Sequence, residues 1–495
     1  MIKNETQCGS TQNGDSNSYM KRTKIIATVG PATDDPGTIR KLILAGVDVF
    51  RLNFSHGDHA SHRRRLDIIR KVARKENRHI AVMQDLQGPK IRVGELQGGI
   101  LYLRAREAAI VTTRNVMGGG DVIPSHYKSL AKDVSPGDRI LMDDGLMELR
   151  VESVDGKDVY CTVIKGGALK EHKGMNLPGV DISQPSLTRK DIIDLKAGLA
   201  MGVDFVAMSF VRWGKDMEKL RKLVKSQGAD VQLIAKIERP EGVHNLDEIL
   251  EHADGVMVAR GDLGVEMAPE KVPGLQKRII EKANEHGKHA ITATQMLESM
   301  IHNPRPTRAE ASDVANAVLD GTGAVMLSGE TAAGEYPVET VLMMARIVKE
   351  AEVRLLKRNT EIPPVKVALQ PNDFSAAVAR AAVRAANDLG AHAILSFTQS
   401  GTTAELVSKY RPQCMVIGGT LHEAVARRMA LTWGVTPVLF DKISNTESLV
   451  ADVDDRLLKT KLLKWGDLIV ITTGVPVGRA GTTNMIKIHR MGYSD

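Results

Sequence analysis

Two neighbouring stretches of the chain decide its fold: VQLIAKIE at residues 231–238 and DGVMVARGD at residues 254–262. Each is an apolar run with the length of a buried parallel strand, and each ends abruptly in charged residues. In parallel α/β sheets, functional groups lie at the carboxyl ends of the strands. Two carboxylates and a lysine at one edge of a sheet therefore indicate a divalent metal site beside an anion-binding site.

Six further runs of the same kind lie before and after these two. They are TKIIATVG (23–30), VDVFRLNF (47–54), HIAVMQDL (79–86), VDFVAMSF (203–210), KHAITAT (288–294) and GAVMLSG (323–329). Amphipathic segments separate most of them, such as PGLQKRIIEKANEHG, where Gly287 is a helix stop. Eight alternating strand–helix units predict an α/β protein with a (β/α)8 TIM barrel.

The alternation is interrupted between residues 87 and 185. This stretch is rich in glycine and turn dipeptides, and its short runs alternate with period two, as in RILMDDGLMELRVESV. We therefore expect a barrel domain formed by residues 21–86 and 186–355. Residues 87–185 should form a small β-barrel cap domain that projects over the carboxyl-end rim.

Two terminal regions complete the predicted organisation. Residues 1–20 are polar and predict a flexible tail. After Pro363-Pro364, residues 365–495 predict a third, α/β domain. Its expected strands are AHAILSFT, QCMVIGG, VTPVLF, DLIVITTG and NMIKIHR.

Composition excludes several classes of function. The formal charge of +7 is mild for 495 residues, and the basic run at residues 63–65 fits a solvated helix face better than a nucleic-acid surface. Only 3% of residues are aromatic, so stacking platforms for RNA are not apparent. Cys8, Cys161 and Cys414 lie far apart, which favours reduced thiols in the cytoplasm. No apolar stretch approaches the span of a bilayer, so we expect neither a membrane nor a nucleic-acid partner.

Polar residues, together with one glycine, lie at the carboxyl ends of seven of the eight predicted strands. They are Arg51, Asn53, Ser55, Asp85, Ser209, Lys236, Glu238, Gly261, Asp262, Thr294, Ser328 and Glu330. Glu238 and Asp262 offer oxygen ligands without His or Cys, which favours Mg²⁺ or Mn²⁺ over zinc. The alternative is that these acids only form ion pairs with Lys236 and Arg260. Lys236 and Arg51 can neutralise a phosphoryl group from two sides.

The familiar nucleotide-kinase motifs are absent from the chain. It has no Walker A sequence, no kinase catalytic loop and no GxGxxG between a strand and a helix. Phosphate must then be held by side chains and metal if the protein transfers it at all.

From about residue 21 to the end, the sequence resembles the pyruvate kinase family. The matching segments are long and occur in order: TKIIATVGPAT, RLNFSHG, DLQGPKIR, KGMNLPG, IAKIERPEGV, VMVARGDLGVE, ITATQMLESMI, PTRAEASDVANAVLDGTGAVMLSGETA and GTTNMIKIH. The family's barrel, β cap and regulatory α/β domain agree with the pattern described above.

The resemblance implies transfer of the phosphoryl group of phosphoenolpyruvate to ADP, giving pyruvate and ATP in the last step of glycolysis. It implies that Arg51 and Lys236 contact the transferred group, and that Glu238 and Asp262 hold Mg²⁺, which also binds the substrate carboxylate and enol oxygen. The backbone of Gly261 and Asp262, with the Thr294 hydroxyl, would bind the carboxylate. We expect Lys236 to stabilise the enolate.

Further roles follow from the same resemblance. Ser328 and Glu330 belong to a chain that delivers a proton to enolpyruvate. ADP is expected between barrel and cap, where the matching residues are Thr28, Pro31, His56, Arg92 and Lys173. Closure of the cap would exclude water.

One departure from the family pattern concerns a monovalent cation. Asn53, Ser55, Asp85 and the Leu86 carbonyl match a pocket that binds K⁺ in many members. In those members a Glu follows the Gly-Pro of the next loop, where this chain has Lys90, and Leu86-Gln87 replaces the common Thr-Lys. We predict that the ammonium of Lys90 takes the place of K⁺, so that activity needs Mg²⁺ but not K⁺.

The last domain contains a turn rich in hydroxyl groups, Thr398-Gln399-Ser400-Gly401-Thr402-Thr403. Such a turn can bind phosphate, although an ordinary helix cap is the alternative. The resemblance implies a site for a phosphorylated allosteric effector, covered by the 474–482 loop with Arg479. It also implies a homotetramer.

Two rival functions remain open at this stage. A metal-dependent lyase or aldolase also stabilises pyruvate enolate on a TIM barrel, but it needs no nucleotide, so Arg51, Lys173 and the cap argue against it. A non-catalytic effector-binding or RNA-binding protein would leave the set of polar strand ends unexplained; a salt-sensitive RNA shift without turnover would favour it.

Overall fold

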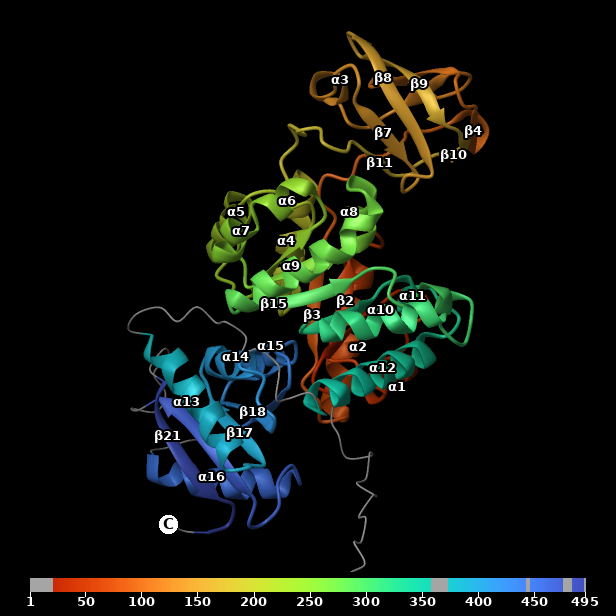
Figure 1. The fold of residues 1–495 in the computed structure, drawn as a ribbon. Coiled ribbons are helices and arrows are strands. Elements are labelled where there is room, and N and C mark those ends of the chain that lie inside the picture. The colour runs from red at the N-terminus through yellow and green to blue at the C-terminus, as the bar shows by residue number, and fades with distance from the viewer. Residues whose placement is uncertain (1–20, 358–372, 442–445, 475–482, 494–495) are drawn as a thin grey trace, which may run out of the picture.

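The structure, a computed structural model, describes residues 21–357, 373–441, 446–474 and 483–493. It has three parts: a central barrel, a cap that stands away from it, and an α/β domain on the opposite side (Figure 1). The predicted tail at residues 1–20 and the Pro363-Pro364 connection lie outside the described residues.

Eight parallel strands form a closed barrel in the order β1-β16-β15-β14-β13-β12-β3-β2. Their bounds are β1 (Lys24–Thr28), β2 (Val49–Asn53), β3 (Ala81–Leu86), β12 (Phe205–Met208), β13 (Gln232–Ile237), β14 (Gly255–Ala259), β15 (His289–Ala293) and β16 (Ala324–Leu327). All eight fall within the predicted runs, so the TIM barrel is confirmed.

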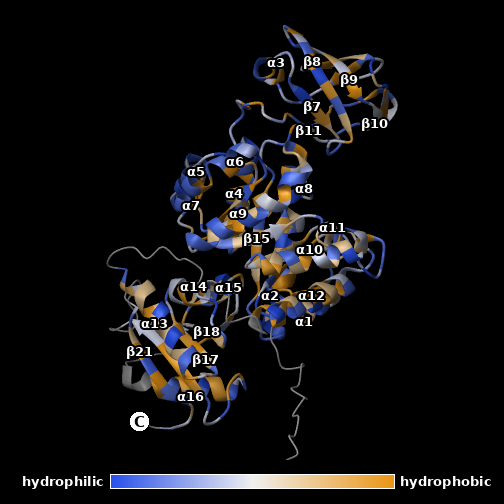
Figure 2. Ribbon diagram, in the orientation of Figure 1, coloured by the Kyte–Doolittle hydropathy of each residue, from blue (hydrophilic) through white to orange (hydrophobic). Residues whose placement is uncertain are grey.

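Helices surround the barrel and cover its outer face (Figure 2). They are α1 (Pro36–Ala45), α2 (His59–Lys75), α4 (Arg189–Met201), α5 (Gly214–Ser226), α6 (Pro240–His244), α7 (Leu246–His252), α8 (Arg260–Glu266), α9 (Val272–Glu285), α10 (Arg308–Leu319), α11 (Gly329–Ala332) and α12 (Pro337–Lys357), with short 3₁₀ turns η2 (Pro269–Lys271) and η3 (Glu298–Ile301). Local sequence sets several ends: Thr188 and Thr307 form capping boxes, and Gly46 ends α1 at a φ of 112°.

The cap consists of two sheets around one core rather than a single closed barrel. A six-stranded sheet has the order β11-β7-β8-β9-β5-β6, and β10 pairs with β4. The elements are η1 (Gln97–Gly99), β4 (Ile100–Leu103), β5 (Ala108–Thr112), β6 (Val122–Pro124), α3 (Leu130–Asp133), β7 (Arg139–Met142), β8 (Met147–Asp155), β9 (Asp158–Lys165), β10 (Gly167–Lys170) and β11 (Met175–Asn176). A turn at Asp143-Asp144-Gly145 joins β7 to β8, with positive φ at all three residues.

The last domain has a five-stranded sheet in the order β19-β18-β17-β20-β21, with β21 antiparallel to its neighbour. Its elements are α13 (Phe374–Asp388), β17 (Ala393–Phe397), α14 (Thr402–Lys409), β18 (Met415–Thr420), α15 (Glu423–Met429), β19 (Val435–Leu439), α16 (Thr446–Lys459), β20 (Leu468–Gly474) and β21 (Thr483–Arg490). It docks on the amino-terminal side of the barrel, where Arg427 pairs with Asp204 at 2.9 Å.

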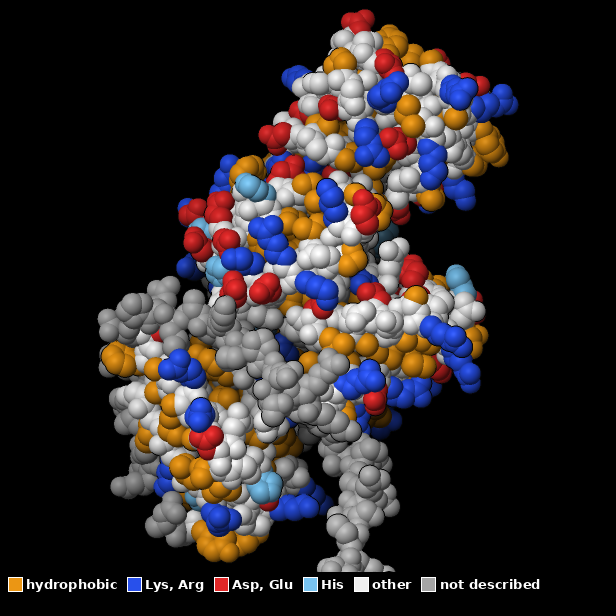
Figure 3. Space-filling view, in the orientation of Figure 1, with side chains coloured by type: hydrophobic (Ala, Val, Ile, Leu, Met, Phe, Trp, Pro, Cys, Tyr) orange, Lys and Arg blue, Asp and Glu red, His pale blue; other side chains and the backbone are white. Residues whose placement is uncertain are grey.

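The described surface carries charges of both signs, and two of the cysteines lie within the described residues. On the face shown in Figure 3, basic and acidic side chains are interspersed. Cys161 and Cys414 are free. Within the described ranges, no helix has the length and apolar character needed to cross a membrane.

Candidate active site

Several candidate residues lie on the inner side of the barrel strands, at the same rim. Ile234, Met83 and Val49 belong to the core inside the barrel. Because side chains alternate along a strand, Lys236, Asp85 and Arg51, two residues further on, point to the same inner side. The apolar inner core therefore ends in a layer of charged groups at the carboxyl ends of the strands.

Asp85 lies between the two cations of this layer. Its side chain is 1% exposed, and its Oδ2 accepts a hydrogen bond from Arg51 Nε at 2.7 Å. Lys236 Nζ lies 3.3 Å from its Oδ1. Burial alone would raise the pKa of Asp85, but the charges of Lys236 and Arg51 outweigh burial and hold that pKa below its usual value. Arg51 also donates to Thr28 Oγ1 at 3.0 Å.

Lys236 is surrounded by acceptors. Its Nζ lies 3.0 Å from Glu238 Oε1 and donates to Ser209 Oγ at 2.6 Å. Burial acts to lower the pKa of Lys236, but the negative charges of Asp85 and Glu238 more than compensate and raise it. Lys236 is therefore a permanent buried cation.

Glu238 and Asp262 are the two carboxylates that the sequence predicts as metal ligands. Burial raises the pKa of Glu238 to about 7, with Lys236 opposing the shift and the negative charge of Asp262 adding to it. Glu238 Oε2 accepts from the Phe210 amide at 2.6 Å. The Asp262 carboxylate has no hydrogen bond or ion pair to any described residue. Two neighbouring carboxylates, one unpaired, fit a hard divalent cation.

The protein offers only part of a coordination shell at this point. Across the described residues, no group of three or more His, Cys, Asp and Glu side chains could hold a metal ion. Two carboxylates leave several coordination positions for substrate and water, as is usual for Mg²⁺.

Arg260 is not the partner of Asp262. It pairs with Asp313 at 2.7 Å and donates to the Thr294 carbonyl at 2.8 Å. The ion-pair alternative considered for the two acids therefore holds for Glu238 with Lys236 but not for Asp262.

Gly261 and Thr294 are also brought together. The Gly261 amide donates to Thr294 Oγ1 at 2.8 Å, and Thr294 has a φ of 66°. A Cβ placed on Gly261 would meet only the Thr294 side chain, at 3.5 Å. Protein packing thus does not require glycine here, and the backbone at this position is open to the close approach of a ligand.

Ser328 and Glu330 follow β16 and differ in their hydrogen bonding. Both oxygens of the fully buried Glu330 carboxylate accept from backbone amides, of Leu297 at 3.1 Å and Ser328 at 2.7 Å. The Ser328 hydroxyl is buried without a hydrogen-bond partner in the described structure. Glu330 is thus hydrogen-bonded to the backbone of its loop, whereas the Ser328 hydroxyl has no partner among the described residues. A role of both residues in proton delivery stays a prediction.

The residues matched to the nucleotide lie on both sides of the barrel–cap junction. Thr28 donates to the Leu327 carbonyl at 2.8 Å, Arg92 to the His172 carbonyl at 3.0 Å, and Lys173 pairs with Asp143 at 2.8 Å. Pro31 and His56 are exposed. Burial lowers the pKa of His56, and the charges of Arg92, Lys90 and Arg51 lower it further. These cations therefore share a positive field suited to an anion.

Two oxygen atoms of the candidate cation pocket already accept hydrogen bonds from neighbouring protein groups. Asn53 Oδ1 accepts from the Ser55 amide at 3.1 Å, and the Leu86 carbonyl accepts from Ser209 Oγ at 2.8 Å. Lys90 is exposed, and its ammonium makes no hydrogen bond or ion pair with the described residues. Its Cε lies beside Gly174, on the cap side. The structure does not bring Lys90 into contact with the pocket.

The hydroxyl-rich turn leads into α14. Thr398 Oγ1 accepts from the Gly401 amide at 2.8 Å, and Gly401 has a φ of 100°. Ser400 and Thr402 share a hydrogen bond of 2.9 Å, whereas Thr403 is buried against Thr483 at 2.7 Å. The predicted covering residue Arg479 lies outside the described residues.

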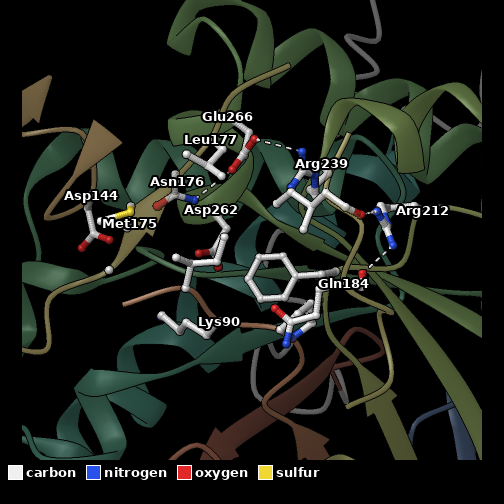
Figure 4. Close-up of a pocket in the computed structure, with 15 residues that line it drawn as sticks. Lys90, Asp144, Met175, Asn176, Leu177, Gln184, Arg212, Arg239, Asp262 and Glu266 are labelled. Atoms are coloured by element: carbon white, nitrogen blue, oxygen red, sulfur yellow. Dashed lines mark hydrogen bonds and ion pairs between the residues drawn. The ribbon is translucent and has the colours of Figure 1, made fainter. Parts of the chain in front are cut away.

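Sequence reasoning missed a second group of polar residues at the hinge of the cap. Asn176, Arg239 and Glu266 line a pocket that extends to Asp262 (Figure 4). The pattern of barrel strand ends does not include Glu266, which ends a helix, or Asn176, which ends a strand of the cap. Arg239 directly follows Glu238 and could have been found from the same pattern.

A TIM barrel with two cations and three carboxylates on its rim, and a cap hinged above them, has the fold and the charges of a barrel enzyme that acts on an anionic substrate. Comparison with known proteins makes this specific. The family description "pyruvate kinase, barrel domain" matches residues 20–341, and "pyruvate kinase, alpha/beta domain" matches residues 376–489. The chain belongs to the pyruvate kinase family, and it is a phosphotransferase.

Individual pyruvate kinases are similar in sequence to this protein over most of its length. A pyruvate kinase of Sporosarcina psychrophila is 46% identical over 479 residues, which cover 96% of this chain and 81% of that protein. One of Geobacillus stearothermophilus is 46% identical over 472 residues, or 95% and 80%. The crystal structure of a pyruvate kinase from Cryptosporidium parvum superposes with a TM-score of 0.88 at 38% identity, over 95% of this chain and 96% of that one. The lyase or aldolase alternative is not favoured.

Proposed function

We propose that this protein transfers the phosphoryl group of phosphoenolpyruvate to ADP, giving pyruvate and ATP, in glycolysis. The observation that supports the proposal most directly is the convergence of Arg51, Lys236, Glu238 and Asp262 on one rim of the barrel. Cations and carboxylates in this arrangement answer the needs of phosphoryl transfer, where positioning and charge stabilisation dominate.

Arg51 and Lys236 hold the phosphoryl group, and Lys236 stabilises negative charge on the enol oxygen as the P–O bond breaks. A buried cation with a raised pKa suits this role because it needs no reorganisation when charge develops. The Gly261 and Asp262 backbone and the Thr294 hydroxyl bind the carboxylate. Ser328, whose hydroxyl has no protein partner in the described structure, hands on the proton that converts enolpyruvate to pyruvate, and Glu330 fixes its loop.

Glu238 and Asp262 would hold Mg²⁺ or Mn²⁺, which supplies positive charge to the substrate when bound. ADP lies against Thr28, Pro31, His56, Arg92 and Lys173, and cap closure excludes water from the reacting groups. Because these residues come from both the barrel and the cap, nucleotide binding should favour closure.

Three finer features belong to the same proposal. Activity needs Mg²⁺ but not K⁺, with the charge of Lys90 replacing that of K⁺ near Asn53, Ser55, Asp85 and Leu86. The turn at residues 398–403, with Arg479, binds a phosphorylated metabolite that activates the enzyme. The protein is a cytoplasmic homotetramer with the domain limits 21–86 with 186–355, 87–185 and 365–495.

A coupled assay tests the central proposal. The purified protein with phosphoenolpyruvate, ADP and Mg²⁺ should form pyruvate and ATP in equal amounts. Pyruvate formed from another substrate without any need for ADP would instead favour a lyase. Stimulation of the assay by sugar phosphates, and its loss in a Ser400→Ala, Thr402→Val double variant, tests the effector site.

A further inference from the structure

The connection that returns from the cap to the barrel is held by side chains of the barrel. Arg239 Nη2 donates to the Val180 carbonyl at 2.8 Å. Arg212 donates to the carbonyls of Ile182 at 2.5 Å and Gln184 at 2.9 Å. These contacts fix the return connection to the two barrel loops that follow β12 and β13.

Glu266 makes a different contact, directly with the cap. Its Oε1 accepts a hydrogen bond from Asn176 Nδ2 at 3.0 Å (Figure 4). Its Oε2 is buried without a hydrogen-bond partner among the described residues, and Arg239 Nη2 lies 3.9 Å away. The Glu266 and Arg239 side chains are 2% and 3% exposed, so the two opposite charges face each other out of contact with solvent. The same guanidinium also donates to Glu241, at 3.2 Å, so Glu266 is the more distant of its two acidic neighbours.

Asn176 moves with the cap. It is the last residue of β11 and pairs with Leu141 of β7 in the six-stranded sheet. The Asn176–Glu266 hydrogen bond therefore joins the sheet of the cap to the barrel, rather than one part of a loop to another.

On the barrel side, both partners are attached to the proposed metal ligands. Glu266 ends α8, the helix that also contains Asp262 about one turn earlier. Arg239 directly follows Glu238. A change in cap orientation transmitted through Asn176 thus reaches the segments that carry both carboxylates.

We infer that Asn176, Glu266 and Arg239 form a hinge clasp, a set of positioning residues that holds the cap in the orientation required for phosphoryl transfer to the nucleotide. This inference rests on the proposed function. The clasp acts through the cap, so it should affect the nucleotide more than phosphoenolpyruvate, whose proposed contacts all lie on the barrel.

The test exchanges donor and acceptor across the hydrogen bond. Asn176→Asp places a second carboxylate against Glu266, and the KM for ADP should rise about tenfold with a fall in kcat, the scale of one hydrogen bond to a charged group. The KM for phosphoenolpyruvate should change less than about twofold. Adding Glu266→Gln to this variant places an amide donor opposite the new carboxylate and should recover most of the loss.

Asn115→Asp is the matched control, because Asn115 is an exposed residue of the cap. It makes the same change of charge away from the hinge and should leave all constants unchanged. If Asn176→Asp does not fold, Asn176→Ala removes the donor without adding a charge and should also raise the KM for ADP, with Asn115→Ala as its control.

Two outcomes would overturn the clasp. One is an Asn176→Asp protein that is active with an unchanged KM for ADP, whether or not its thermal stability falls. The other is a double variant that is no better than Asn176→Asp alone. Wild-type protein that forms no pyruvate from phosphoenolpyruvate and ADP would overturn the proposed function and the clasp together, so the two failures are distinguishable.

Discussion

Lys236 Nζ and Glu238 Oε1 lie 3.0 Å apart on the inner face of one strand. The cation proposed for the phosphoryl group is thus in contact with an acid proposed for the metal. Each compensates the charge of the other in a buried site, where an unpaired charge is costly. Contact with Lys236 opposes the rise in the pKa of Glu238 that burial causes, and the pair holds both side chains in place before substrate arrives.

Lys236→Met should reduce pyruvate formation by about 10³-fold or more, since a fixed charge at the developing enolate is lost. The fold should survive because Asp85 retains Arg51 and methionine keeps the bulk. Steady-state assays with thermal unfolding measure both effects. Lys222→Met, at an exposed lysine of α5, is the control. Activity within tenfold of wild type would contradict the proposed role.

Glu238→Gln should weaken binding of divalent metal by about tenfold or more, because it removes one of two charged ligands. The amide oxygen can still accept from the Phe210 amide, so local structure should persist. Titration with Mn²⁺ alone, followed by electron paramagnetic resonance, measures the affinity without any need for turnover. Glu335→Gln, at an exposed acid, serves for comparison. An unchanged affinity would place the metal elsewhere.

Activity in tetramethylammonium buffer should change less than about twofold when KCl is added, since Lys90 already supplies a positive charge near the site. Lys90→Ala should lower activity and make it dependent on K⁺. Lys165→Ala, at an exposed position of β9, should do neither. A large stimulation of the wild-type enzyme by K⁺ would refute this prediction.

Glu405 lies where the last domain contacts the barrel, and its ionisation should make the free energy of unfolding depend on pH. It accepts from Gln232 Nε2 at 2.9 Å, and His289 Nε2 lies 3.6 Å away. Burial would raise the pKa of Glu405, but His289, Lys409 and Gln232 overcome it and lower the pKa to about 2. An unfolded glutamate titrates near 4.5. The stabilisation, on the order of 3 kcal/mol, is therefore complete above pH 4.5 and is lost as pH falls towards 2.

The measurement is urea unfolding at pH 6 and pH 3.5. Glu405→Gln should be less stable than wild type at pH 6, and the difference should shrink at pH 3.5. Glu281→Gln, at an exposed residue of α9, should show no such change. A difference that is the same at both values would show that ionised Glu405 does not stabilise the fold.

The sequence alone determined the barrel and the members of its rim. Apolar runs of strand length, repeated eight times with amphipathic helices between them, admit few other folds. Period two then places Lys236 on the side of Ile234 and Arg51 on that of Val49. These features are local, so they can be read without knowing which strands are neighbours.

The tertiary structure alone decided how the charges are paired. Asp85 lies between Arg51 and Lys236, Arg260 turns to Asp313, and Asp262 is left without a partner in the described structure. Glu266 reaches Asn176 across the hinge. Each of these contacts joins residues from different elements, and its distance depends on strand register, barrel closure and cap orientation. Periodicity along the chain carries none of that information, because it reports which side of an element a residue occupies and not what lies opposite.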